Sequence, residues 1–223
     1  MRQTVTLLGD YFFYAFSTLS IICILAVLLT PARSFIIADL YQQLDINGQK
    51  RALASFAEKL AHAGLAPASF TPQLLIRKRS REMLVLSDDT VVASYPVSLG
   101  RSPVGIKLRG TDHKTPEGQY YICNKIEGHR YHLFLQINYP SPDDAKRGAV
   151  QQIIKPGEEA RIEAAWQQMH PPPVDTALGG PLGIHGFGAE TNWTTDGSIG
   201  LHNIHMEELY WNIATGTPVA IIP

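Results

Sequence analysis

The chain has 223 residues, enough for one enclosed domain of moderate size and an appendage. Its 19 Lys and Arg residues nearly balance its 20 Asp and Glu residues, and the formal net charge of −1 gives no electrostatic case for a nucleic-acid partner. Of the two cysteines, Cys23 lies in an apolar N-terminal run and Cys123 in an alternating, aromatic-rich segment. We therefore expect no disulfide between them, and we expect Cys123 to be a buried, inert thiol.

An uncharged apolar run extends from Tyr11 to Thr30. Its length matches the roughly 20 residues that span the hydrocarbon core of a bilayer. The run is longer than a usual signal-peptide core, and the residues LLTPARS lack a clear small-x-small cleavage site. We therefore predict a membrane anchor over residues 1–32; a cleaved signal peptide and a buried core helix are the alternatives. Both the anchor and the signal peptide place the rest of the chain outside the cytoplasm.

Apolar residues recur at near-helical intervals from Arg33 to Ala63, which predicts a helix. We interpret it as a stalk that lifts a domain off the membrane, within a helical linker over residues 33–72. The stretch GLAPASFTP, from Gly64 to Pro72, is rich in turn-forming residues and marks the start of a domain over residues 73–223.

Within this domain the apolar pattern changes to short alternating runs, which predict strands. These runs are LLIRKRS, EMLVLSD, TVVASYPVSLG, GQYYICNKI, RYHLFLQINYP, LGIHGF and TPVAIIP. We expect hairpin turns at Asp88-Asp89 and at Glu127 to His129. Helical patterns cover Pro142 to Ile154, Gly157 to Gln168 and the residues MEELYWNI. The fold class is therefore mainly β with peripheral helices (α+β), a small β-sandwich or barrel behind an N-terminal transmembrane helix.

Four ordered blocks carry a resemblance to a known family. They are TPEGQYYICNK (Thr115 to Lys125), RYHLFLQINYPSPDDAKRG (Arg130 to Gly148), LGGPLGIHG (Leu178 to Gly186) and NWTTDGSIGLHNIHMEELY (Asn192 to Tyr210). Together they resemble the catalytic domain of L,D-transpeptidases, the YkuD-type or ErfK-like fold. The order and spacing of the blocks make the resemblance specific, whereas the residues GIHG alone would be a weak signal.

The resemblance implies an enzyme of the bacterial cell wall. In that family a cysteine attacks the carbonyl of meso-diaminopimelate in a peptidoglycan tetrapeptide, and the terminal D-alanine leaves. The acyl group then passes to an amine of another stem peptide, to a lipoprotein, or to water. Such a protein would be anchored in the inner membrane with its domain in the periplasm, which agrees with the apolar N-terminal run.

Ser198 takes the position of the family's nucleophilic cysteine. The family pattern Ser/Thr-His-Gly-Cys corresponds here to Thr195, Asp196, Gly197 and Ser198, so that the histidine and the cysteine are both replaced. A cysteine can be held as a thiolate near neutral pH, whereas a serine must lose its proton to a well-oriented base while it attacks. We therefore predict that the fold and the peptide cleft are kept and that acyl transfer is weak or absent.

The resemblance assigns His185 as the general base and acid; a core histidine bonded to a backbone carbonyl is the alternative. Gly186 would keep the chain close to the imidazole, with an ordinary turn glycine as the alternative. The backbone N–H groups of Gly197 and Ser198 are the expected oxyanion donors, because we expect a helix after this loop.

Three further residues are candidates for substrate binding. Asp196 would orient His185 or recognise an acceptor amine, unless it is only a turn or cap residue. Trp193 would line the groove or only pack, and His202 is the third candidate. His202 and His205 lack the acidic partner of a zinc site, so we predict no metal and no cofactor.

Two other features are less specific. Asn203 is expected to cap the last helix. Arg130 and Tyr131 are expected either to face substrate carboxylates or to form a solvated strand edge.

Several functions stay open. The chain is a working L,D-transpeptidase-like enzyme, a hydrolase of the same family (an L,D-carboxypeptidase or amidase), or a tethered pseudoenzyme that binds wall peptides. Ser198 would also fit an engineered replacement of a native cysteine. The expected partners are peptidoglycan stem peptides, a lipoprotein acceptor and, through the N-terminal helix, the membrane; no nucleic acid is expected.

Overall fold

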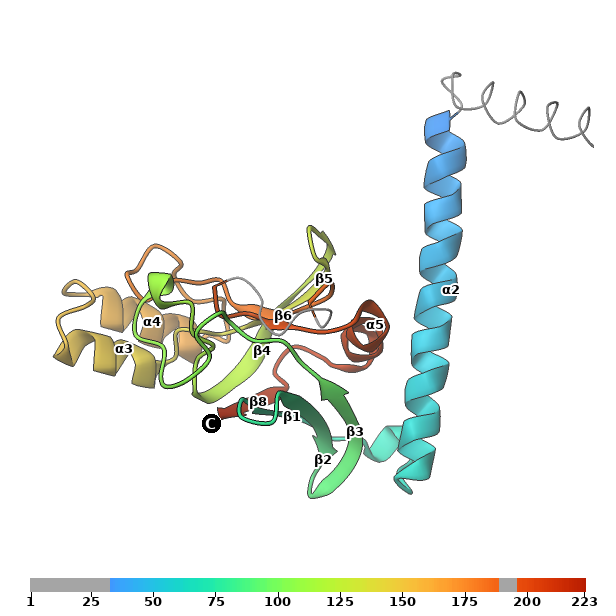
Figure 1. The fold of residues 1–223 in the computed structure, drawn as a ribbon, viewed down its shortest axis with the longest axis horizontal. Helices are drawn as coiled ribbons and strands as arrows, with labels where there is room; N and C mark the ends of the chain where they lie inside the picture. The colour runs from blue at the N-terminus through green and yellow to red at the C-terminus, as the bar shows by residue number, and fades with distance from the viewer. Residues whose placement is uncertain (1–32, 189–195) are drawn as a thin grey trace, which may run out of the picture. The chain divides into compact units, whose positions relative to one another are not determined.

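The computed structural model describes residues 33–188 and 196–223 (Figure 1). The predicted anchor over residues 1–32 and the candidate Trp193 lie outside this part of the chain. No helix within the described ranges combines the length and the apolar character that a bilayer crossing requires. The chain divides into two compact units, residues 1–48 and residues 49–223, and the second contains all the strands found in the described residues.

A single mixed sheet of eight strands forms the centre of the second unit. Its spatial order is β3-β2-β1-β8-β4-β5-β6-β7. The pairs β1–β8 and β6–β7 are parallel, and the other neighbours are antiparallel. The strands are β1 (Pro72–Arg77), β2 (Glu82–Ser87), β3 (Thr90–Pro96), β4 (Gly118–His129), β5 (His132–Ile137), β6 (Gly183–His185), β7 (Ile199–Gly200) and β8 (Pro218–Ile222).

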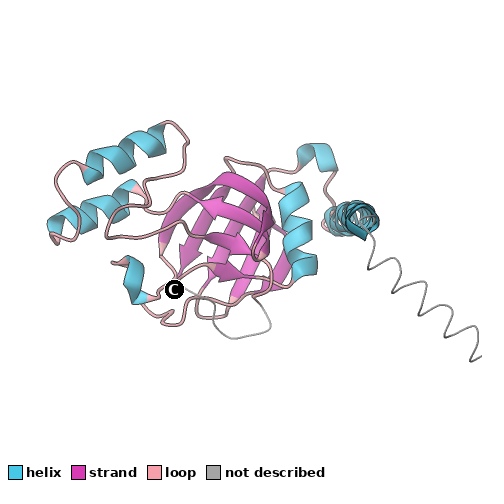
Figure 2. Ribbon diagram, turned by 90° about the horizontal axis from the view of Figure 1, so that it is seen from above, coloured by secondary structure: helices cyan, strands magenta, loops and turns pink. Residues whose placement is uncertain are grey.

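The sheet is strongly curved into a half-barrel (Figure 2). Just beyond β3, Ser98 exchanges two backbone hydrogen bonds of 2.9 Å with Gly200 of β7, so the two ends of the sheet order meet. The predicted α+β class is confirmed, and the architecture is one bent sheet rather than two stacked sheets. The bridge also fixes the backbone next to Ser198.

Four helices accompany the sheet in the part of the chain described here: α2 (Arg33–His62), α3 (Pro142–Val150), α4 (Glu158–Gln167) and α5 (Asn203–Asn212). All four coincide with predicted helical segments. The expected cap of α5 was wrong, because His202 is the N-cap and Asn203 is already helical. The side-chain oxygen of Asn203 instead accepts the backbone N–H of Phe187 at 2.9 Å.

The second half of α2 packs into the domain. Phe56 and Leu60 are buried in the same core cluster as the strand residues. Glu208 of α5 accepts hydrogen bonds from Ser55 at 2.6 Å and Tyr95 at 2.7 Å, and it forms an ion pair with Lys59. This part of the predicted linker therefore contributes to the core and does not act only as a spacer.

The two predicted hairpin turns had different outcomes. The turn at Asp88-Asp89 is confirmed, since it joins β2 to β3. The turn at Glu127 to His129 was wrong, because β4 continues to His129 and the turn lies at Arg130 and Tyr131. The strand register shifts between Ile126 and His129, and Gly128 has a φ of +63°. The glycine therefore marks a β-bulge and not the turn itself.

Candidate active site

The parallel strands β6 and β7 bring His185 and Ser198 to one cavity. His185 is in register with Gly200, and Ser198 lies two residues before Gly200. Ser198 directly precedes β7, so the pairing of β6 with β7 brings its backbone close to His185. Both residues line one cavity of about 290 Å³. The structure therefore joins the two residues that carry the predicted chemistry.

The imidazole of His185 is buried and held by three neighbours. Its Nδ1 lies 2.7 Å from the carbonyl oxygen of Gly186. Since a carbonyl can only accept, Nδ1 carries the hydrogen and Nε2 is left as the basic nitrogen. The ring of Tyr131 stacks on the imidazole at a centroid distance of 4.6 Å, and Phe134 lies nearly parallel at 6.5 Å. The group that orients the base through Nδ1 is thus a neutral carbonyl and not a carboxylate.

Gly186 is required by a close approach of the chain and not by a turn. Its φ does not lie in the left-handed region, but a Cβ there would come within 2.4 Å of the Asn203 side-chain oxygen. It would also lie 3.0 Å from the carbonyl oxygen of Tyr131. The glycine therefore lets the chain beside the imidazole pack against both α5 and the β4–β5 turn.

Gly197 packs the loop before Ser198 against another backbone segment. Its φ is +123°, a conformation that other residues rarely adopt. A Cβ at this position would come within 2.1 Å of the carbonyl oxygen of Lys114. The prediction that a helix directly follows this loop was wrong, since Ser198 is followed by β7, and α5 begins only at Asn203. No helix N-terminus lies directly behind the backbone N–H groups of Gly197 and Ser198.

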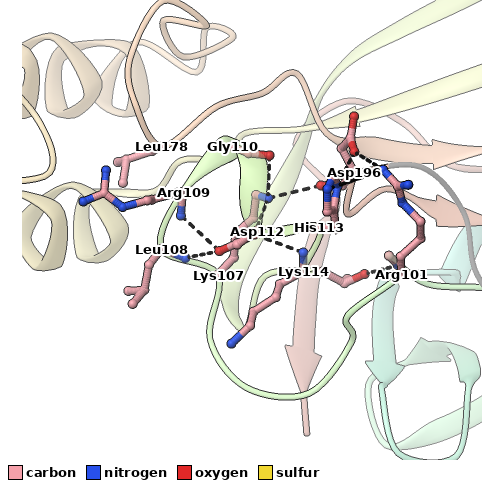
Figure 3. A network of polar contacts seen from close by, with 12 residues as sticks. Arg101, Lys107, Leu108, Arg109, Gly110, Asp112, His113, Lys114, Leu178 and Asp196 are labelled. Carbon is pink, nitrogen blue, oxygen red and sulfur yellow. Dashed lines mark hydrogen bonds and ion pairs between the residues drawn. The ribbon is translucent and has the colours of Figure 1, made fainter.

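A buried lysine holds the same loop from the other side (Figure 3). The Nζ of Lys107 donates to the carbonyl oxygen of Asp196 at 3.1 Å and to Oδ1 of Asp112 at 2.9 Å. Asp112 also accepts three backbone N–H groups, from Leu108, Arg109 and Lys114. Burial acts to raise the pKa of Asp112, but these donors outweigh it and lower the pKa. The segment thus presents a fixed positive charge to the loop backbone.

The carboxylate of Asp196 pairs with residues of the same wall and does not orient His185. Its Oδ1 lies 2.5 Å from Nδ1 of His113 and 3.3 Å from the guanidinium of Arg101 (Figure 3). Burial acts to raise the pKa of Asp196, but His113 and Arg101 outweigh it and lower the pKa. Asp196 lines the cavity, so a role in contacting substrate stays a prediction.

His202 is not one of the described residues that line the cavity. It precedes α5, and its ring lies 5.8 Å from that of His205. Within the described ranges, no group of three or more His, Cys, Asp or Glu side chains is placed to hold a metal ion. Cys123 lies on β4, where burial raises its pKa to about 12. It is half-buried rather than fully buried, and at neutral pH it is a protonated thiol.

Two parts of the cavity wall were missed or undervalued from the sequence. Lys107 was not predicted as a cavity residue, because a lysine in a loop is expected to be exposed to solvent unless its partners are known. Arg130 and Tyr131 lie in the β4–β5 turn and line the cavity, and Arg130 is exposed to solvent. The remaining lining residues described are Gly110, Phe134 and the run from Gly179 to Leu182.

This arrangement, a curved β-domain with His185 and Ser198 in one cavity, is the one predicted from the sequence for an acyl-transfer domain. Residues 71–221 match YkuD, the L,D-transpeptidase catalytic domain. The chain belongs to this family. It is 27% identical over 161 residues to YqjB of Bacillus subtilis, whose name assigns it provisionally to the L,D-transpeptidases; the match covers 71% of this chain and 75% of YqjB.

Solved structures with a similar fold come from other bacteria. The helical cell shape determining protein Pgp2 of Campylobacter jejuni is 19% identical, with a TM-score of 0.47 over 74% of this chain and 54% of Pgp2. Bd1075 of Bdellovibrio bacteriovorus is 20% identical, with a TM-score of 0.45 over 70% of this chain and 49% of Bd1075. The L,D-transpeptidase of Xylanimonas cellulosilytica is 16% identical, with a TM-score of 0.42 over 69% of this chain and 61% of that structure. The chain therefore spans less than two thirds of these structures.

Proposed function

We propose that this protein binds peptidoglycan stem peptides in the cavity between His185 and Ser198, and that acyl transfer at the diaminopimelate–D-alanine bond is weak or absent. The observation that supports this proposal is the partner of His185. The imidazole faces the same cavity as Ser198, but its Nδ1 donates to the neutral carbonyl of Gly186. The partner of Nδ1 is therefore a neutral carbonyl and not the carboxylate that orients the base in a serine triad.

The chemistry follows from the charge that forms during attack. When Ser198 attacks, its proton must move to Nε2, and the ring becomes an imidazolium. In serine triads an aspartate stabilises this cation and fixes the tautomer, and its replacement by asparagine costs about ten-thousand-fold in turnover. A thiolate nucleophile is already ionised before attack and makes less demand on the base. The carbonyl of Gly186 would serve a cysteine adequately and a serine poorly.

The cellular setting is part of the same proposal. Residues 1–32 would anchor the protein in the inner membrane, with the domain in the periplasm, where stem peptides occur. A lipoprotein would be an alternative acceptor of the acyl group if any transfer takes place. These assignments rest on the apolar N-terminal run and on the family's substrate class.

The test is incubation of the full chain, in detergent, with a tetrapeptide muropeptide, followed by mass spectrometry of the products. We expect binding with little or no release of D-alanine. Robust release that disappears in Ser198→Ala would overturn the proposal and establish a working serine enzyme. The products would then separate a transferase, which yields cross-linked dimers, from a hydrolase, which yields tripeptides.

A further inference from the structure

Two cations line the cavity, and they differ in how their charge is balanced. Lys107 is almost fully buried and forms an ion pair with Asp112 at 2.9 Å. Arg130 is exposed and has no ion pair with any acid in residues 48–188 and 196–223. The anionic residue of the wall, Asp196, is already paired with Arg101. Among the described residues of the cavity wall, Arg130 therefore brings a positive charge that no described carboxylate balances.

The β4–β5 turn places this charge beside the candidate base. Arg130 and Tyr131 are the two residues between β4 and β5. The guanidinium of Arg130 lies over the Tyr131 ring, with its carbon 4.7 Å from the ring centroid. The same tyrosine stacks on the imidazole of His185 at 4.6 Å. One aromatic side chain thus connects the free cation to the position where the chemistry is expected.

We propose that Arg130 is a specificity-determining residue that binds a carboxylate of the bound peptide. A guanidinium presents donors in a planar fork that matches a carboxylate, and such charge-assisted pairs are among the stronger hydrogen bonds. The inference rests on the proposed function and names the chemical group that the site selects. The terminal carboxylate of a tetrapeptide fits, because it lies only one residue, about 3.8 Å of backbone, beyond the scissile carbonyl. The side-chain carboxylate of diaminopimelate is the other carboxylate of the peptide that Arg130 could bind in the same way.

The experiment compares three peptides on the full chain by isothermal titration calorimetry. They are the stem tetrapeptide as free acid, its C-terminal amide, and a tetrapeptide whose diaminopimelate carboxyl is amidated. We expect the wild type to bind the free acid about tenfold or more tightly than one of the two amides. Arg130→Gln should lose this preference while its affinity for that amide stays unchanged. Arg130→Lys should keep part of it, since an ammonium retains the charge without the fork.

Arg79→Gln is the matched control, because it removes an equal charge from an exposed position that does not line this cavity. It should keep the full preference, and thermal melts should show all variants folded. The amide that weakens binding identifies which carboxylate Arg130 holds. Equal binding of all three peptides by the wild type, or an unchanged preference in Arg130→Gln, overturns the role of Arg130 and leaves the proposed function standing. If no peptide binds, both proposals fail.

Discussion

The two sides of the cavity, one around His185 (the histidine side) and one around Ser198 (the serine side), are held in place by different kinds of contacts. On the histidine side, His185 is only 3% exposed and lies against the rings of Tyr131 and Phe134. The serine side is polar, and its backbone is held by the buried ammonium of Lys107. On each side a glycine, Gly186 or Gly197, permits an approach that a Cβ would block.

This difference shows that geometry and reactivity are set by separate residues. Backbone packing on both sides keeps the two reacting positions in one cavity, whichever atom occupies position 198. Reactivity depends on that atom and on the neutral partner of His185. A substitution at Ser198 should therefore change the chemistry without moving the walls, whereas substitutions in the walls should change stability first.

The largest effect is expected from Ser198→Cys. If the cavity keeps the geometry of a thiol enzyme, the new thiolate should be acylated by a carbapenem about ten-thousand-fold faster than Ser198, the factor lost when a serine triad lacks its aspartate. Intact-protein mass spectrometry would follow the adduct. Ser198→Ala is the blank, and Ser198→Cys with His185→Ala should react slowly. Absence of an adduct after long incubation would mean that the serine side has drifted from the family geometry.

The next effect concerns the wall behind Ser198. Gly197→Ala places a Cβ 2.1 Å from the carbonyl oxygen of Lys114, so the loop must move, and we expect a loss of about 3 kcal/mol in the free energy of unfolding. Gly180→Ala is a matched control, since its φ of +122° is nearly the same while its nearest neighbour is 3.4 Å away. Urea denaturation would compare the two. Equal losses would mean that the backbone conformation, and not the clash, determines the cost.

The sequence predicted those parts of the fold that depend on local patterns. Strand alternation and the Asp88-Asp89 turn were sufficient to place the β2–β3 hairpin. Gly128 misled the prediction, because a glycine with positive φ suits a bulge as well as a turn, and strand pairing decides between them. The cap of α5 was misplaced for a similar reason: the Asn203 side chain is engaged by Phe187, a residue distant in the sequence.

The site was predictable only where a motif carried it. His185 and Ser198 come from two blocks of the family pattern, and the structure joins them through strand register. Orienting His185 was one of three roles considered for Asp196, but its partners His113 and Arg101 belong to a loop whose path a linear sequence does not reveal. Lys107 was missed because burial of a lysine is a tertiary property.

A smaller effect is expected from Lys107→Met on the serine side. The change removes one donor from the partly buried Asp112 and one from the Asp196 carbonyl, and we expect a loss of about 2 kcal/mol in the free energy of unfolding. Arg77→Met breaks the exposed pair with Glu82 and should cost less than about 0.5 kcal/mol. Chemical denaturation of both variants would measure the difference. Similar small losses would show that Lys107 does not hold the loop.

The smallest effect is expected from Asp196→Asn at the rim of the cavity. The pKa of Asp196 is lowered below its ordinary value of 3.8, so the folded state gains stability from the ionised carboxylate. This gain is fully present above about pH 4 and disappears as the pH falls through the lower, folded-state pKa. The side chain is 60% exposed, and solvent screening should keep the contribution below about 0.5 kcal/mol.

Thermal melts of the wild type and Asp196→Asn would test this prediction. The wild type should be slightly more stable at pH 6, and the difference should vanish near pH 2. A difference that persists in acid would show that the amide disturbs packing, because a protonated carboxyl and an amide carry the same charge. It would then follow that the serine side depends on the shape of residue 196, as the histidine side depends on the shape of Gly186.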